Sequence, residues 1–428
     1  MDARAKFLIV DQSLRDTNGH HFEYDLSIAK AAAQAGFMVA IAAHKHCDRN
    51  LSFGEFKTLY WFQRAWDEIP ESRVRRLARR LLSTLPSGMR HATLRVGARI
   101  KAGIVTDRAD IQPNYALPTF GKELVALTAS EQLDGGDHVL VHTLGNDELH
   151  AAISALAEYA KLPNIHIVLR RDAEEPAVRS DPWGGISAAL DHAMRRFGDR
   201  IRLYTDTDAL TFQYKQLAPG ATIKTLPIAL ELVDEARSQA PRADGPLRLT
   251  YLGNARTEKG FHLLPHAVAA LEHPFLTSGQ ARFVIQCNAS LDLEDQAVVD
   301  ARAKLSRHGA HKVELIGQAL QPNEFQRRLI AADIIILPYE ASLYRRRSSG
   351  ILIQALTAGR PLVVPAETWM SDTMPADCGI VFSGPADLPR AIASAIEAFP
   401  RLSAAARDQA PRWRAEHNAS LLVDRLIA

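Results

Sequence analysis

Cysteine and long apolar runs are both scarce in this sequence. The three cysteines, Cys47, Cys287 and Cys378, are too few and too scattered for a disulfide framework or a zinc ribbon, and they fit a reducing compartment. The apolar run at residues 7–10 is too short for the core of a signal peptide. No stretch approaches the ~20 apolar residues of a membrane helix, so we expect a cytoplasmic protein whose membrane contact is peripheral, at the inner face.

A charge excess and several catalytic motifs are also missing. The 51 basic residues against 49 acidic residues give a net charge of only +2, whereas a chain built for nucleic acid would usually be more basic. We therefore expect no nucleic-acid partner. The sequence has no Walker loop, no G-x-S-x-G, no H-E-x-x-H and no G-x-G-x-x-G, so the enzyme classes that depend on those motifs have no support.

Short apolar runs alternate with helical patterns through most of the 428 residues, which favours parallel sheets covered on both faces. The rhythm breaks at a polar, proline-containing segment near residues 230–246, which is typical of a linker. At ~100–200 residues per domain, we predict an α/β protein with two doubly wound Rossmann-like domains divided near residue 235. A ligand is expected between them, at the carboxyl ends of the strands.

Residues 48–130 interrupt the rhythm of the first half. Within them, residues 71–102 hold nine arginines or lysines and one glutamate, and aromatic residues precede this basic run. Basic residues beside aromatics at helical spacing can dock on an anionic membrane surface. The same pattern also fits a solvated helical face with a few core aromatics, so both interpretations stay open.

A glycine-containing loop follows a strand-like run at residues 251–264 (YLGNARTEKGFHLL), and a helix is expected to begin near Glu258. Arg256 and Lys259 lie in or beside this loop, at the carboxyl end of the strand. Two cations in this place can hold a diphosphate, the lysine as a mobile point charge and the arginine as a bidentate fork.

A second segment of the same kind spans residues 332–365. After a strand-like run, three consecutive arginines lead into Ser348, Ser349 and Gly350. Ser348 suits the N-cap of the following helix, whose free backbone N–H groups form a ready anion site. Gln354, one turn into that helix, can hydrogen-bond a sugar hydroxyl.

Together the two segments resemble retaining glycosyltransferases of the GT-B fold, in the glycogen-synthase-like superfamily (glycosyl transferases group 1, family-4-like). That family has a G-x-x-x-x-E-K-G-like loop, which residues 253–260 match. It also has a P-S-x-x-E-x-F-G-x-x-x-x-E-A-x-x-x-G-x-P-V segment, matched here by Pro338, Ala355, Gly359, Pro361 and Val363. The likeness covers residues 247–385, whereas the first half agrees in its rhythm and in a few residues.

The resemblance implies two Rossmann-like domains that face each other across a cleft. Residues 1–235 would form the acceptor domain, with a basic helical insertion at about 48–130. Residues 236–410 would form the nucleotide-sugar donor domain, and residues 411–428 a helix that crosses back to the first domain.

The resemblance also assigns roles in the second domain. Lys259 and Arg256 would hold the diphosphate and stabilise it as the leaving group, without a metal. The other donor-binding candidates are Gly253, Asn254, Gly317, Gln318, Arg346, Ser348, Ser349, Gly350 and Gln354. The family's paired glutamates, eight residues apart, are Arg346 and Gln354 here, and Arg256 takes the place of the family's arginine, which falls on Asn254.

In the first domain, the family's glycine-rich loop corresponds to Asn18, Gly19, His20 and His21. His142 and Asp172 follow strand-like runs, where acceptor-side catalytic residues belong. Alternatively, His142 is a satisfied histidine at a strand end and Asp172 is a helix cap.

The implied reaction is a retaining, metal-independent transfer of a hexose from a nucleotide-diphosphate sugar to an acceptor hydroxyl, with no cofactor. The acceptor would be a saccharide or a lipid-linked molecule, as in the assembly of cell-surface polysaccharide or lipopolysaccharide. The leading alternative is a non-catalytic sugar-nucleotide-binding protein on the same fold, which the changes at Arg346 and Gln354 favour.

Two further alternatives stay open. One is a manganese-dependent glycosyltransferase of the other common fold, which would use the Asp-x-Asp at residues 206–208 unless Asp206 only caps a helix. The other is a sugar-nucleotide epimerase or a phosphorylase on the same fold. His44, His46 and Cys47 are read as a surface loop, because no second pair of ligands lies at metal spacing.

Overall fold

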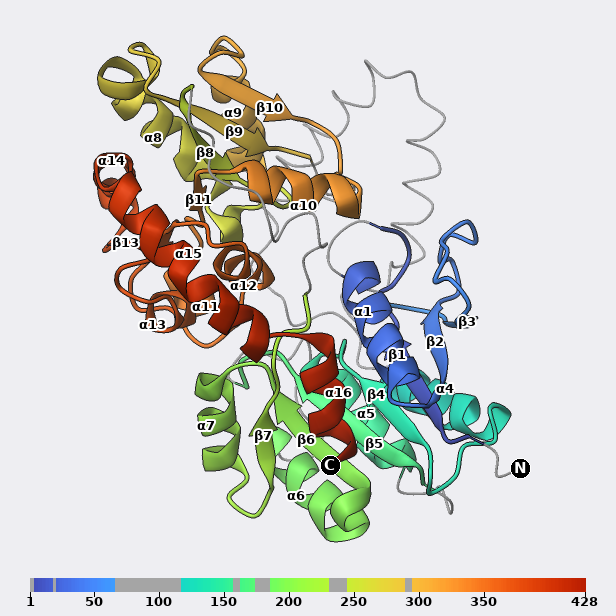
Figure 1. The fold of residues 1–428 in the computed structure, drawn as a ribbon. Helices are drawn as coiled ribbons and strands as arrows, with labels where there is room; N and C mark the ends of the chain where they lie inside the picture. The colour runs from blue at the N-terminus through green and yellow to red at the C-terminus, as the bar shows by residue number, and fades with distance from the viewer. Residues whose placement is uncertain are drawn as a thin grey trace, which may run out of the picture.

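The computed structural model describes residues 4–17, 21–65, 117–156, 162–173, 185–230, 245–288 and 295–428. They form two α/β domains, each built on one sheet (Figure 1). All the strand pairs described are parallel, as the alternating pattern predicts.

The first sheet has seven strands in the order β3-β2-β1-β4-β5-β6-β7. These are β1 (Lys6–Asp11), β2 (Met38–His44), β3 (Lys57–Phe62), β4 (His138–Val141), β5 (Asn164–Leu169), β6 (Ile201–Thr205) and β7 (Ile223–Thr225). The helices are α1 (His21–Gln34), α4 (Leu117–Ser130), α5 (Asn146–Leu156), α6 (Gly185–Phe197) and α7 (Asp208–Leu217). Residues 7–11 of β1 are all buried, because helices cover both faces of a parallel sheet.

The second sheet has six strands in the order β10-β9-β8-β11-β12-β13. These are β8 (Leu247–Tyr251), β9 (Ala281–Gln286), β10 (Val313–Ile316), β11 (Ile334–Ile336), β12 (Leu362–Pro365) and β13 (Gly379–Phe382). The helices are α8 (Leu264–Leu271), α9 (Gln296–Leu305), α10 (Pro322–Ala331), α11 (Ala341–Tyr344), α12 (Gly350–Thr357), α13 (Trp369–Thr373), α14 (Leu388–Glu397) and α15 (Phe399–Glu416). Because β8 and β11 are neighbours, the two segments that carry the resemblance leave the sheet at the same edge.

The predicted insertion at 48–130 is wrong at both of its ends. Strand β3 pairs with β2 as the edge of the first sheet, and α4 packs beside it. Trp61 joins the two, since its Nε1 donates to the carbonyl of Glu123 at 2.9 Å. Its partly buried indole thus packs against the core of the first domain. The basic run at 71–102 lies outside the described residues.

The carboxyl-terminal segment ends in a separate helix, α16 (Ala419–Ile427), on the first domain (Figure 1, red). The predicted single helix over 411–428 is divided, because Asn418 accepts a hydrogen bond from Leu421 N and starts a new helix there. α16 packs against α1, and Arg202 Nη1 donates to the carbonyl of Leu426 at 3.0 Å. Among the described residues, no helix has the length and hydropathy to cross a membrane.

Candidate active site

The loop after β8 is shaped by two glycines with positive φ, Gly253 at 106° and Gly260 at 70°. A Cβ on Gly260 would lie 1.7 Å from the carbonyl oxygen of Pro338, which follows β11. The two motif segments therefore pack directly against each other. The helix predicted to begin near Glu258 does not start there. Two short 3₁₀ turns come first, on either side of Gly260, and α8 begins after them.

Lys259 is partly buried in this loop. A Cβ built on Gly253 would lie 3.2 Å from the Lys259 ammonium and 3.4 Å from Cδ1 of Ile351 in the first turn of α12. Lys259 Nζ also lies 5.8 Å from the ring centroid of Tyr339. Burial, reinforced by the positive charge of Arg256, lowers the pKa of Lys259 to about 8. An anion bound beside this ammonium would offset that penalty.

Arg256 is more exposed than Lys259. Its side chain is 47% exposed, and its Nη1 pairs with Glu258 Oε1 at 3.3 Å. An exposed pair of this kind contributes little to stability, so the guanidinium can exchange its partner.

Two residues that the sequence patterns did not single out hold the backbone of the loop. Gln286, the last residue of β9, accepts a hydrogen bond from Gly253 N at 2.7 Å. Asn288 donates to the Asn254 side chain at 2.7 Å and accepts from the backbone N–H of Ala255. Their place at the end of the neighbouring strand is the signal that could have found them.

The start of α12 differs by one residue from the prediction. Ser349, not Ser348, is the N-cap, and it accepts from Leu352 N at 3.3 Å. Gln354 is buried one turn further on, whereas Gly317 and Gln318 are exposed beyond β10. Gly350 packs closely against Leu230, since a Cβ built on Gly350 would lie 2.6 Å from Cδ1 of that leucine.

Ser348 and Arg346 instead bind the first domain. Arg346 Nη1 lies 2.7 Å from Asp172 Oδ2, and Ser348 Oγ donates to Asp206 Oδ2 at 2.6 Å. Thr207 Oγ1 donates to the carbonyl oxygen of Arg346 at 2.8 Å. We call these three the domain-bridging contacts. Through them, Asp172, predicted on the acceptor side, contacts Arg346, predicted on the donor side.

Asp172 and Asp206 both contact other side chains, and the residue that caps α7 is Thr207. Asp172 accepts a hydrogen bond from Gln213 Nε2 at 2.6 Å, and Thr207 provides the cap of α7. The Asp-x-Asp carboxylates have separate partners, Ser348 for Asp206 and Thr225 for Asp208. Each carboxylate thus accepts a hydrogen bond from a different hydroxyl group.

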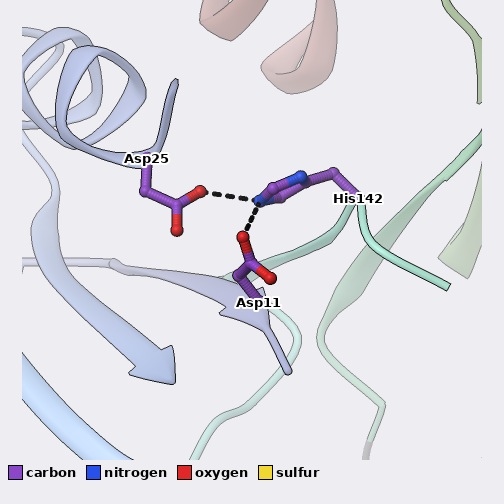
Figure 2. A group of neighbouring side chains, drawn as sticks. All are labelled: Asp11, Asp25 and His142. Carbon is purple, nitrogen blue, oxygen red and sulfur yellow. Dashed lines mark hydrogen bonds and ion pairs between the residues drawn. The ribbon is translucent and has the colours of Figure 1, made fainter. Parts of the chain in front are cut away.

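His142 belongs to a buried group at the carboxyl edge of the first sheet. Asp11 ends β1, His21 and Asp25 lie one turn apart on α1, and His142 follows β4. Figure 2 shows His142 Nε2 between two carboxylates, 2.7 Å from Asp25 Oδ1 and 3.7 Å from Asp11 Oδ2. His21 Nδ1 lies 2.7 Å from the same Asp11 oxygen. We call Asp11, His21, Asp25 and His142 the histidine–aspartate cluster.

The protonation of the cluster follows from burial and mutual charge. Burial raises the pKa of Asp25 well above its usual value, and the charge of Asp11 adds to the effect. Burial lowers the pKa of His142 to about 3 despite Asp11. Burial would raise the pKa of Asp11, but the charge and hydrogen bond of His21 outweigh it and lower that pKa. These shifts favour the protonated form of Asp25, the neutral form of His142 and the ionised form of Asp11.

Three cluster members approach each other closely enough to surround a metal ion. Single ligand atoms of Asp11, Asp25 and His142 lie within 4.8 Å of one another. The same atoms are, however, committed to hydrogen bonds, His142 Nε2 with Asp25 and Asp11 Oδ2 with His21. We therefore interpret the set as a proton-sharing network. Asn18, Gly19 and His20 lie outside the described residues.

No protein-family model and no curated protein matches the sequence. Solved structures match along nearly its whole length. Sucrose-phosphate synthase from Thermosynechococcus elongatus is 14% identical, with 99% of this chain and 98% of that chain covered and a TM-score of 0.64. HepE from Anabaena, solved with UDP-glucose, is 12% identical, with 99% and 98% covered and a TM-score of 0.62. WaaG, a glycosyltransferase involved in lipopolysaccharide biosynthesis, is 14% identical, with 98% of each chain covered and a TM-score of 0.54.

At these identities the likeness shows the fold. Each of the two parallel sheets with its helices is a Rossmann-like domain, and their arrangement over the full chain matches glycosyltransferases of the GT-B type. The predicted fold class is confirmed: the chain has the GT-B fold.

Proposed function

We propose that the protein transfers a hexose from a nucleotide-diphosphate sugar to an acceptor hydroxyl. One observation carries this proposal: the Lys259 ammonium lies against Gly253 and the first turn of α12, at the carboxyl edge of the second sheet. A cation beside a helix N-terminus suits a diphosphate. The fold adds support, because HepE, which has been solved with UDP, shares it.

In this proposal, Lys259 and the backbone N–H groups at the start of α12 stabilise the departing diphosphate without a metal ion. Removing one preorganised donor of this kind typically costs ~3–4 kcal/mol, or ~10²–10³ in rate. Arg256 turns from Glu258 to the phosphates, and Gln354 binds a sugar hydroxyl. Retention of the anomeric configuration, which the resemblance implies, is not part of the proposal.

We further propose a lipid-linked or anionic acceptor at the cytoplasmic face of a membrane. The support is the basic run of the sequence at residues 71–102, and WaaG, which shares the fold, acts in lipopolysaccharide biosynthesis. Basic clusters gain about 1 kcal/mol per charge near an anionic surface. Flotation with anionic and with neutral liposomes tests this part, and binding to neither contradicts it.

A non-catalytic sugar-nucleotide-binding protein is the second candidate. The observation in its favour is the pairing of Arg346 with Asp172, which occupies a predicted donor-binding side chain. Such a protein would bind a nucleotide sugar without releasing the nucleotide.

The test is a thermal-shift panel of UDP-, GDP- and ADP-sugars, followed by an assay of nucleotide release. A ligand at 100 times its dissociation constant adds ~2.7 kcal/mol of stability. We expect one nucleotide series to stabilise the wild type and the control Lys304→Ala, on the exposed side of α9, but not Lys259→Ala. Stabilisation by none of the sugars contradicts the proposal, and binding without nucleotide release favours the second candidate.

A further inference from the structure

Arg360 is a buried cation between the end of α12 and the start of β12. Only 6% of the residue is exposed. Its backbone is fixed, because Arg360 N donates to the carbonyl of Ala355 at 2.9 Å and Gly359 N donates to that of Leu356 at 3.1 Å. These two hydrogen bonds, with Gly359 at a φ of 66°, form the Schellman ending of a helix. The Arg360 side chain therefore starts from a fixed position at the amino end of β12.

The Arg360 guanidinium has no partner among the residues that the structure describes. It makes no hydrogen bond or ion pair with them, and its Nε is buried. An arginine carries five N–H donors in a fixed fork and stays charged in proteins. Buried charges are normally paired or hydrogen-bonded, because burying one alone costs free energy. A buried arginine without a protein partner therefore points to a bound anion.

Asp333 lies between Arg360 and a second arginine at the amino edge of the second sheet. Strand β11 pairs with β8 on one side and with β12 on the other. The register of these pairs places Asp333, which precedes β11, level with Arg248 on β8 and with Arg360 before β12. The Asp333 carboxylate holds the backbone of β8, since its Oδ2 accepts from Arg248 N at 2.8 Å. A single carboxylate thus stands between two arginines.

Arg407 on α15 adds a third positive charge. A Cβ built on Gly359 would lie 3.0 Å from Arg407 Cα, so α15 packs directly against the end of α12. Burial lowers the pKa of Arg360, the charge of Asp333 opposes this effect, and the charge of Arg407 adds to it. Arg407 itself is exposed. We call Arg248, Asp333, Arg360 and Arg407 the amino-edge cluster, which holds three positive charges and one negative charge.

We propose that the amino-edge cluster binds a phosphate group, with Arg360 as the main contact and Arg407 as the second cation. The planar fork of an arginine matches two oxygens of a phosphate. Because the cluster has an excess of positive charge, it favours a dianion such as phosphate over a monoanion such as acetate or chloride.

This phosphate site is separate from the proposed donor site. Arg360 precedes β12 at the amino edge of the sheet, whereas Lys259 follows β8 at the carboxyl edge. Helix α12 runs between the two edges, with its first turn near Lys259 and its last turn before Arg360. The inference therefore does not depend on glycosyl transfer. A Lys259→Ala background removes the cation that would compete for phosphate at the donor side.

Calorimetric titration of Lys259→Ala with inorganic phosphate, at constant ionic strength in chloride, measures the binding. Adding Arg360→Gln should raise the Kd by about 10-fold or more, because charge-assisted hydrogen bonds are lost. Adding Arg407→Gln should raise it by about 3-fold, since an exposed charge contributes less. Arg401→Gln, at an exposed position of the same helix α15, is the matched control and leaves the Kd unchanged.

The other outcomes decide the proposal and the source of the phosphate. Tighter binding of glycerol 3-phosphate than of inorganic phosphate identifies a phosphate monoester, and the reverse identifies the free ion. No phosphate binding by Lys259→Ala, or equal affinity for acetate, overturns the proposal. A Kd that stays within about 3-fold after Arg360→Gln also overturns it. If Arg360→Gln does not fold, Arg407→Gln decides, and a Kd equal to that of Arg401→Gln overturns the site.

Discussion

Arg346 of the second domain lies 2.7 Å from Asp172 of the first domain, and Gln213 holds the other oxygen of the same carboxylate at 2.6 Å. The pair is half-buried, with 29% of the Arg346 side chain and 17% of the Asp172 side chain exposed. A carboxylate of the first domain thus neutralises a cation in the loop that leads into α12. Any anion that Arg346 binds in the second domain competes with Asp172.

Asp172→Asn should strengthen the binding of the nucleoside diphosphate that the thermal-shift panel selects. The change removes the competing charge. The amide oxygen of the new asparagine can still accept the hydrogen bond from Gln213 Nε2. We expect a gain of up to about 10-fold at low salt, equivalent to ~1.4 kcal/mol, and less at high salt. Isothermal titration measures it, with exposed Asp199→Asn as the control. Weaker binding would show that the pair holds the loop in its binding geometry.

Gly260→Ala should be much more damaging than Gly279→Ala. The two glycines have similar φ, 70° and 73°, so the backbone strain of about 1–2 kcal/mol is common to both. Only Gly260 faces the Pro338 carbonyl, 1.7 Å from a Cβ, whereas a Cβ on Gly279 meets nothing within 4 Å. Denaturant midpoints of both variants give the difference, and equal losses would contradict the close packing of the two motif loops.

Donor binding should weaken as pH rises through the pKa of Lys259, which burial lowers to about 8. The Lys259 side chain, which we propose holds the diphosphate, is mostly protonated at pH 7 and mostly neutral at pH 9, so we expect the affinity to fall by about 10-fold across that range. Lys259→Arg keeps its charge and should give a flat profile. Calorimetry at several pH values tests this, and an unchanged wild-type affinity at pH 9 would exclude Lys259 as the binding cation.

His166 should make the first domain less stable in acid. It is buried between His138, at 3.0 Å, and the Tyr204 hydroxyl, at 3.3 Å, and burial lowers its pKa to about 3. Because the unfolded chain titrates near pH 6.5, it binds more protons than the folded chain between pH 6.5 and pH 3. The free energy of unfolding therefore decreases as the pH is lowered from 6.5 to 3, by up to about 1.4 kcal/mol per pH unit for this residue.

Urea unfolding at pH 7 and pH 5 measures that slope for the wild type and for His166→Asn, which should be flatter. His142 contributes in the same direction, since its pKa is also about 3, so part of the slope remains. Exposed His192→Asn is the control. A slope unchanged by His166→Asn would show that the histidine is already protonated in the folded protein.

The sequence predicted the elements whose signal is local. Continuous apolar runs such as residues 7–10 and 334–336 become buried parallel strands, because helices on both faces leave little room for polar side chains. The loop at residues 253–260 also has a local signal, since Gly253 and Gly260 both adopt positive φ. Strand β3 (KTLYWF) was missed because its aromatic residues were grouped with the basic run that follows, as part of the predicted insertion at 48–130.

The sequence by itself determined the α/β class, the two domains and the ends of strands at which polar residues gather, because hydrophobic periodicity and glycine placement act over a few residues. Only the tertiary structure decided which of those residues meet. Asp11 and His142 are 131 positions apart and Asp172 and Arg346 are 174 apart, so no local spacing pairs them. Their contacts arise from strand order, which places β1 beside β4, and from the packing of one domain on the other.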